Sequence, residues 1–282
     1  MQHSTWMWTI ARLYLLAVMM IAGGAGCTAL FPDSSKAQHR LPPLVGPRNA
    51  IEIEVYFVDR RKGDPMIGDR LWSSLHSVHT LDPDSARQLE NDGFRVAMSA
   101  SRPPRPLAVL MSLSDENDPT RRVVMQRYTI PAGQETLVVA SEIPDGTVIH
   151  RPDQDTARPL EMRLGRAIFR IQADKVEDGW TRLVVIPEIQ HGPMAARPTP
   201  REQDWIYQES QQRVTLYSDR ITAELNEQEI LALGLGSSDE GDIGGHFFVA
   251  DSENGLERLI LIRISGMSRI EPVRSDLADN LN

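Results

Sequence analysis

Hydrophobic and polar residues alternate where the first folded segment begins. Apolar side chains take every second position, which gives Ile51, Ile53, Val55 and Phe57 on one face and Glu52, Glu54 and Tyr56 on the other. This period of two predicts a strand with one buried face. Asp64-Pro65 and Asp82-Pro83 each place a capping residue before a proline, which predicts two helix starts. The first helix would bury a face made of Ile67, Leu71, Leu75 and Val78, and Gly93 is suited to end the second.

The remainder of this segment predicts further strands and one short helix. Phe94–Ala100 has an extended pattern, and Leu107–Leu113 is predicted to form one or two helical turns. Arg122–Ile130 and Glu135–Ala140 are predicted strands, and residues 131–134 between them are typical of a hairpin turn. We therefore interpret residues 50–140 as a small α/β domain.

The chain changes character after a polar, proline-containing stretch at residues 141–159, which we interpret as a linker. Six later segments have the composition of strands: Leu160–Ala173, Gly179–Ile189, Arg213–Leu225, Glu229–Leu235, His246–Ala250 and Leu256–Ile264. Gln203–Gln212 is predicted to be helical. The expected fold class is α+β, in which the small α/β unit precedes a β-rich, mainly antiparallel unit over residues 160–272. Residues 273–282 form a polar tail.

A short apolar run near the start of the sequence predicts an export signal over residues 1–26. Arg12 precedes Leu13–Ile21, and small residues follow up to Gly26. The run is shorter than the roughly 20 residues that a permanent membrane helix needs, and glycines interrupt its end. Residues 27–49, which are rich in proline, are predicted to form a tether. An ordinary secretory signal cut near Gly26 and an uncleaved membrane anchor are the two alternatives.

Cys27, the only cysteine of the chain, directly follows the small residues Gly24-Ala25-Gly26. This arrangement resembles the lipid-attachment site of bacterial lipoproteins, although Gly24 stands where that family usually carries leucine. The resemblance implies acyl chains on Cys27 that hold the protein on a membrane. Thr28 and Ala29 follow the cysteine, and in Gram-negative lipoproteins the absence of aspartate there implies the outer membrane, facing the periplasm.

The composition limits the classes of partner. The chain has 39 acidic and 30 basic side chains, so nucleic acid is not an expected partner, because phosphate binding needs clustered positive charge. A hydrophobic fraction of 41% is that of a folded protein. With a single cysteine no disulfide forms within the chain, so core packing must supply the stability.

Three pieces of the C-terminal half occur in an informative order. Trp180–Ile189 is a strand with a proline and an acid near its end, and two predicted strands flank a polar turn at residues 226–229. Gly244–Phe248 then precedes the hydrophobic strand Leu256–Ile264. Over residues 180–264 this order is similar to the C-terminal β-module of bacterial secretins, the ring channels of secretion systems. The repeated Pro-x-Leu-Gly loop is absent and residues 190–212 show no amphipathic strands, so the resemblance implies a secretin-like β-fold without channel activity.

Two groups of residues suggest metal chemistry, and each has a plainer explanation. His76 and His79 lie three apart on the predicted first helix and would reach one metal ion, but histidines near a helix C-terminus also stabilise its dipole. The glycine-rich loop at residues 234–245 carries three acids, Asp239, Glu240 and Asp242, that would suit calcium. Its spacing does not match an EF-hand, and a flexible connection explains it equally well.

No motif in the chain indicates catalysis. Ser237 and Ser238 lack the Gly-x-Ser-x-Gly context of a hydrolase nucleophile. We therefore assign no catalytic residue, no metal and no cofactor, and the binding residues stay unassigned. The leading interpretation is a non-enzymatic envelope lipoprotein that scaffolds or binds other envelope proteins. The alternatives are an accessory component of a secretion or export apparatus, and a hydrolase or metal-dependent enzyme of unfamiliar type.

Overall fold

The computed structural model describes residues 48–115, 117–150, 159–177, 179–201, 204–236, 242–251 and 254–270. All of these residues belong to one compact unit. The predicted signal, Cys27, nearly all of the tether and the polar tail lie outside the described residues. Among the helices that are described, none is long and apolar enough to cross a membrane.

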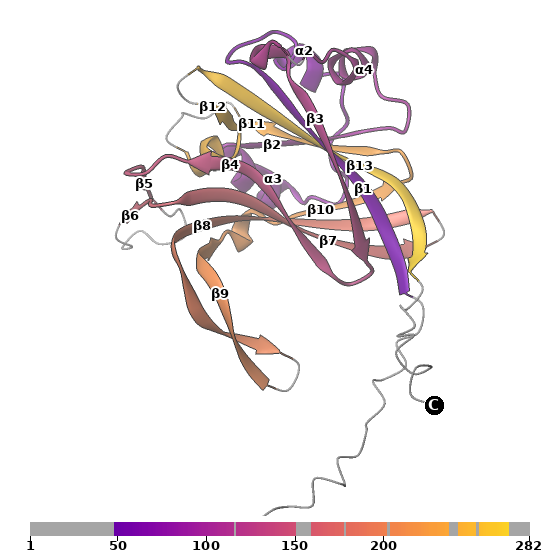
Figure 1. The fold of residues 1–282 in the computed structure, drawn as a ribbon. Coiled ribbons are helices and arrows are strands. Elements are labelled where there is room, and N and C mark those ends of the chain that lie inside the picture. The colour runs from indigo at the N-terminus through magenta and orange to yellow at the C-terminus, as the bar shows by residue number, and fades with distance from the viewer. Residues whose placement is uncertain are drawn as a thin grey trace, which may run out of the picture. The chain divides into compact units, whose positions relative to one another are not determined.

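Two antiparallel sheets build the folded unit (Figure 1). The first, sheet A, has the order β2-β11-β13-β1-β3, with β12 paired to β13. Its strands are β1 (Arg48–Arg61), β2 (Phe94–Ser99), β3 (Val123–Pro131), β11 (Ile230–Leu235), β12 (Val249–Asp251) and β13 (Leu256–Ile270). The pair β1–β13 runs in register from Arg48 opposite Ile270 to Arg61 opposite Leu256, with one irregularity at Glu52/Ile53.

Sheet B has the order β10-β8-β7-β4, with β9 paired to β8. Its strands are β4 (Glu135–Ile143), β7 (Gly165–Glu177), β8 (Trp180–Arg201), β9 (Asp204–Thr215) and β10 (Ile221–Asn226). A small separate ribbon joins β5 (Val148–Ile149) to β6 (Leu160–Glu161). The helices are α2 (Asp69–Trp72), α3 (Pro83–Asn91), α4 (Arg105–Ser112), and the 3-10 turns η2 (Pro119–Arg121), η3 (Tyr217–Asp219) and η4 (Ile243–Phe247).

The main core lies between the two sheets. The alternating residues of β1, such as Ile53 and Val55, face buried residues of sheet B, such as Val185. Phe169 and Phe247 stack within this core with ring centroids 5.0 Å apart. A second core covers the other face of sheet A, where helices α2 and α4 pack against it (Figure 1). The result is three layers, in which sheet A lies between two helices and sheet B.

The expectation of mainly antiparallel β-structure is confirmed, because every strand pair between the described residues is antiparallel. The expected division into residues 50–140 and 160–272 differs from the structure. Strands from both sides of the expected linker share sheet A, and β4 joins β7 in sheet B. The physical reason is that β13 is apolar on both faces and is therefore a central strand: the two cores cover its faces, and β1 and β11, from either side of the expected linker, pair with its edges.

Two predicted helices are also corrected. The first helix shrinks to α2, because the backbone of His76 exchanges hydrogen bonds of 2.8 and 2.7 Å with Met98 at the edge of β2. Gln203–Gln212 is not helical, since residues from Asp204 onward form β9. The predicted start of α3 is confirmed, because the Asp82 carboxylate accepts hydrogen bonds from the backbone of Asp84 and Ser85.

Candidate protein-binding arm

The long strand β8 leaves sheet B at half its length. Its first part, up to Gln190, pairs with β7, whereas residues 195–201 pair only with β9. Figure 1 shows this two-stranded ribbon extending away from the sandwich. We call residues 191–201 and 204–212 the arm. The sequence analysis found no strand pattern here, and that expectation is wrong.

A bulge at the base sets the direction of the arm. The register between β8 and β9 shifts between His191 and Ala195, so β8 carries extra residues that bend the ribbon. Gly192 lies in this bulge with φ 76°, a conformation that favours glycine. Its N–H donates to the Arg163 carbonyl at 2.7 Å, and its own carbonyl accepts from Gln211 Nε2 at 2.7 Å. The base of the arm is therefore fixed to the loop before β7.

The arm leaves backbone groups without partners. Within the described chain, β9 pairs only with β8, and residues 195–201 of β8 have no second neighbour. Unpaired strand edges are templates for another chain, and a lone two-stranded ribbon is only marginally stable in water. Two large side chains are exposed on it, Met194 at 58% and Tyr207 at 78%. These properties suit a surface that binds another protein.

A groove of about 880 Å³ runs along the arm and its base, lined by residues of β7, β8 and β9 together with Leu137 and Leu160. Three arginines line it, Arg166, Arg197 and Arg213, against a single carboxylate, that of Glu209. Burial and the neighbouring charge of Arg197 lower the pKa of His191, which also lines the groove. The groove is therefore positively charged, although the chain as a whole has a net charge of −9.

The arginines of the groove are held by neutral groups. Arg166 Nη2 donates to Gln211 Oε1 at 2.8 Å and to Gln190 Oε1 at 3.4 Å. Arg197 Nε donates to the Ser210 carbonyl at 3.2 Å. Among the residues that the structure describes, no carboxylate forms an ion pair with any of the three arginines. Within the described residues, their positive charge therefore has no carboxylate partner.

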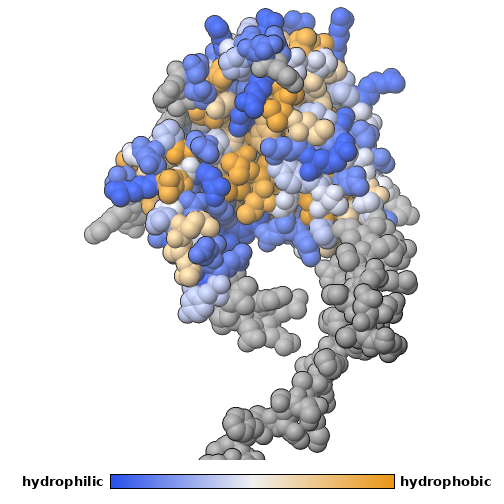
Figure 2. All heavy atoms as spheres, in the orientation of Figure 1, coloured by the Kyte–Doolittle hydropathy of each residue, from blue (hydrophilic) through white to orange (hydrophobic). Residues whose placement is uncertain are grey.

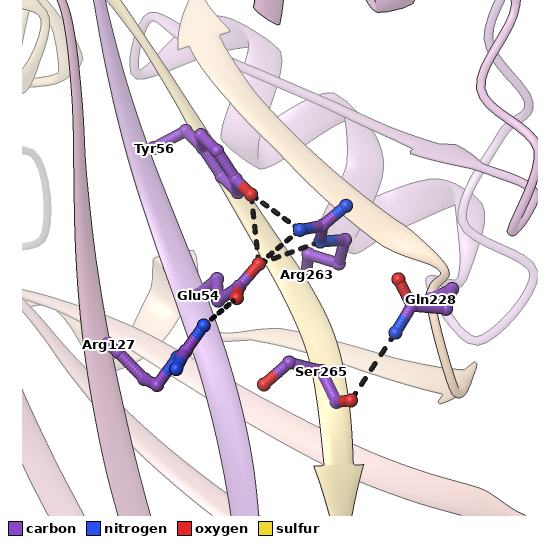
Figure 3. Close-up of polar contacts among 6 residues, drawn as sticks. All are labelled: Glu54, Tyr56, Arg127, Gln228, Arg263 and Ser265. Atoms are coloured by element: carbon purple, nitrogen blue, oxygen red, sulfur yellow. Dashed lines mark hydrogen bonds and ion pairs between the residues drawn. The ribbon is translucent and has the colours of Figure 1, made fainter.

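A different polar cluster on sheet A has an internal role (Figure 3). The buried Glu54 of β1 accepts from Arg127 Nη2 at 2.7 Å, from the Tyr56 hydroxyl at 2.8 Å and from Arg263 Nε at 3.0 Å. Burial raises the pKa of Glu54, but the hydrogen bonds from Arg263, Arg127 and Tyr56 outweigh it and lower the pKa to about 2. Because these residues belong to β1, β3 and β13, the cluster ties three strands together.

A second ion pair lies within sheet A, and its arginine also donates a hydrogen bond to sheet B. Arg258 of β13 donates to both carboxylate oxygens of Asp59 at 2.7 and 2.9 Å, and to the Ala140 carbonyl of β4 at 2.6 Å. Figure 2 shows hydrophobic side chains gathered on one face of the folded unit. Among the residues of β4 and β12, Leu137, Val139 and Val249 are exposed apolar side chains.

The structure does not place the two histidines as the sequence predicted. His76 lies at the edge of sheet A and neither it nor His79 is on a helix. Within the described residues, no group of three or more His, Cys, Asp or Glu side chains could hold a metal ion. Cys27 lies outside the described residues, as do the acids Asp239 and Glu240 of the proposed calcium loop.

The glycines at the two ends of that loop have a packing role. A Cβ on Gly244 would lie 2.5 Å from the Gly93 carbonyl carbon, and a Cβ on Gly234 would lie 2.5 Å from Trp72 Cζ2. The Gly244 N–H donates to the Asp92 carbonyl at 2.7 Å, so the chain passes directly against the end of α3. Trp72 itself is buried in the second core.

The sequence analysis predicted neither the arm nor the role of the arginines that line the groove. Pro193, Pro198 and Pro200 are typical of an irregular connecting segment. Prolines are, however, also tolerated in a strand whose edge has no partner. The β-forming run Trp205-Ile206-Tyr207 was the available signal for a strand.

Comparison with known proteins gives little that is specific. No protein-family model matches the chain, and no curated protein matches it. Among solved structures it is weakly similar to a pilotin–secretin (AspS–GspD) complex from ETEC, with 9% sequence identity and a TM-score of 0.26. The match covers 80% of this chain and 50% of that chain, so it spans about half the length of its counterpart.

Proposed function

We propose that this protein is an envelope lipoprotein, anchored through Cys27, whose folded body binds other envelope proteins through the arm and does no catalysis. The observation that carries the proposal is the arm itself, a ribbon with unpaired edges and an uncompensated positive groove. Edges of this kind favour pairing with another chain.

The sandwich does not need the arm for its own core. The buried core of sheet B ends at Ile189 on β8 and resumes with Val214 on β9, and no described residue between them belongs to either hydrophobic core. Ordering the arm costs conformational entropy that its own burial does not offset. A segment that contributes nothing to the core is best explained by contacts with a partner.

The anchor fits this arrangement. Residues 28–47 separate Cys27 from the start of β1. Twenty residues of extended chain reach about 70 Å, enough to hold the folded unit well away from a membrane surface. Two or more acyl chains would make that attachment stable, because each buried methylene contributes about 0.8 kcal/mol.

The narrower alternative is a role in a secretion or export apparatus, with localisation at the periplasmic face of the outer membrane. The order of the pieces over residues 180–264 and its resemblance to the secretin β-module support it. In that case the partner would be a component of the apparatus.

The test compares three forms of the full chain in the cell envelope by native electrophoresis after mild solubilisation. In the arm-deleted form an Asn-Gly turn replaces residues 192–211, so that His191 and Gln212, which are opposite each other, flank it. The wild-type chain should migrate in a larger complex, and the arm-deleted chain should remain membrane-bound but leave that complex. The Cys27→Ala form should become soluble. A complex that is unchanged without the arm would refute the binding proposal, and a membrane-bound Cys27→Ala form would refute the anchor.

A further inference from the structure

We infer that the groove binds an acidic, extended segment of the partner protein, whose carboxylates pair with Arg166 and Arg213. This inference rests on the proposed function, because it names the chemistry of a partner segment at the base of the arm. Arg166 of β7 and Arg213 of β9 lie at that base, just outside the arm. It is carried by the contrast between these two arginines and Arg170 and Arg182 of the same sheet, which have carboxylate partners.

Arginines elsewhere on sheet B have carboxylate partners. Arg170, four residues along β7 from Arg166, pairs with Glu188 and with Glu135. Arg182 of β8 pairs with Glu224 of β10 at 2.8 Å. Arg166 and Arg213 form no such ion pair within the described residues, and Arg166 is held only by side-chain amides. A guanidinium that is held only by neutral acceptors forms a stronger interaction when a carboxylate binds to it, since hydrogen bonds between two charged groups are about twice as strong as those between neutral ones.

The two arginines form a row across the sheet. Gln190 lies opposite Arg166 on the neighbouring strand, and Arg213 lies opposite Gln190 on the next one. Two interstrand spacings separate their backbones by about 10 Å. In an extended chain, residues i and i+3 are also about 10 Å apart and residues i and i+2 about 7 Å. Only residues at i and i+2 present their side chains on the same face of an extended chain, and long arginine side chains cover that spacing, so two acids two residues apart are the expected ligand.

The remaining lining favours a peptide over other anions. Gln208 and Gln212 offer amides that hydrogen-bond to peptide backbone, and Leu160 and Met194 offer apolar contacts. The volume lies within the roughly 300–1,000 Å³ of ordinary ligand sites. Three arginines in a chain with net charge −9 are too few for nucleic acid, whose binding needs many phosphate contacts.

The test uses the full chain in non-ionic detergent and fluorescein-labelled peptides of eight residues, measured by fluorescence anisotropy. The peptides carry two aspartates separated by one to four positions in a Thr/Val background, with asparagine versions as controls. We expect the tightest binding when the aspartates are at i, i+2, and at least tenfold weaker binding of the asparagine versions. The double variant R166Q/R213Q should lose at least tenfold in affinity for the aspartate peptides.

The matched control is R87Q, which also removes an arginine, in this case one that pairs with Asp84 on the exposed surface of α3. This variant should change the peptide affinity less than twofold. Unchanged thermal unfolding of R166Q/R213Q establishes that it is folded. Equal binding of aspartate and asparagine peptides, or equal binding by R166Q/R213Q, would overturn the inference. So would binding to vesicles with 30% phosphatidylglycerol but to none of the peptides, which would assign the groove to lipid.

Failure of this inference and failure of the proposed function give different results. If R166Q/R213Q stays in the native complex while the arm-deleted chain leaves it, the arm binds a partner but the groove does not recognise acids. If the arm-deleted chain stays in the complex, the proposed function itself is wrong.

Discussion

Replacing Glu54 by glutamine perturbs the most heavily hydrogen-bonded carboxylate that we describe. The side chain of Glu54 is 6% exposed and holds Arg127 and Arg263 from the two strands that flank β1. Glutamine has nearly the same shape, so the core should not be disturbed. The substitution removes the negative charge and leaves the guanidinium groups of Arg127 and Arg263 beside a neutral amide.

The size of the effect follows from the pKa of Glu54. Its pKa is about 2 in the folded protein against an ordinary pKa of 4.5 for a glutamate side chain. At about 1.36 kcal/mol per pKa unit, this difference corresponds to about 3 kcal/mol of stabilisation at pH 7. That is a large part of the 5–15 kcal/mol by which proteins of this kind are stable.

The sign of the pH dependence is fixed by the direction of the shift. A carboxylate with a lowered pKa stabilises the fold above the unfolded value, near pH 4.5, and loses this contribution as the pH falls toward 2. The wild-type protein should therefore be about 3 kcal/mol more stable than E54Q at pH 7, and the difference should close by pH 2. Other carboxylates affect both proteins alike and cancel in the comparison.

The assay is urea unfolding at pH 7, 4.5 and 2.5, followed by tryptophan fluorescence. Asp84→Asn, which removes an exposed ion pair with Arg87, is the control and should cost less than about 1 kcal/mol. A difference between wild type and E54Q that is below 1 kcal/mol at pH 7, or that is constant over this range, would refute the reasoning.

Two further predictions concern the fold. Gly244→Ala should lower the free energy of unfolding by about 1–3 kcal/mol, because its Cβ would lie 2.5 Å from Gly93. The control Gly266→Ala should be nearly neutral, because a Cβ there has nothing within 4 Å. Equal urea midpoints for the two variants would contradict this prediction. The arm-deleted chain should unfold cooperatively, with a midpoint temperature within a few degrees of that of the wild type, because the deletion removes no core residue. Loss of the cooperative transition in calorimetry would show that the arm is part of the core.

The local features of the fold were predictable from the sequence. The alternation of Ile51 to Phe57 identified β1, the run of apolar residues identified β13, and Asp82-Pro83 identified the start of α3. Each of these signals lies within a few consecutive residues. The predicted turn at residues 131–134 also forms, with Gly133 at φ 76°. It connects β3 of sheet A to β4 of sheet B, however, and not two strands paired with each other.

The pairing of distant strands was not predictable from local patterns. The partner of β1 is β13, some 200 residues away, and nothing within either segment specifies the other. The same limit applies to the groove, since Arg166, Gln190 and Arg213 become neighbours only through strand register. The turn at residues 226–229 likewise separates β10 in sheet B from β11 in sheet A, where the sequence suggested one hairpin.

Photocrosslinking from the arm inside the intact envelope tests the central claim most directly. A photoreactive amino acid at Tyr207, exposed on the arm, is compared with the same group at Glu90, exposed on α3. The account predicts a discrete protein adduct from position 207 that is absent from position 90 and is lost in R166Q/R213Q. No adduct from position 207, or the same adducts from both positions, would contradict a protein-binding arm.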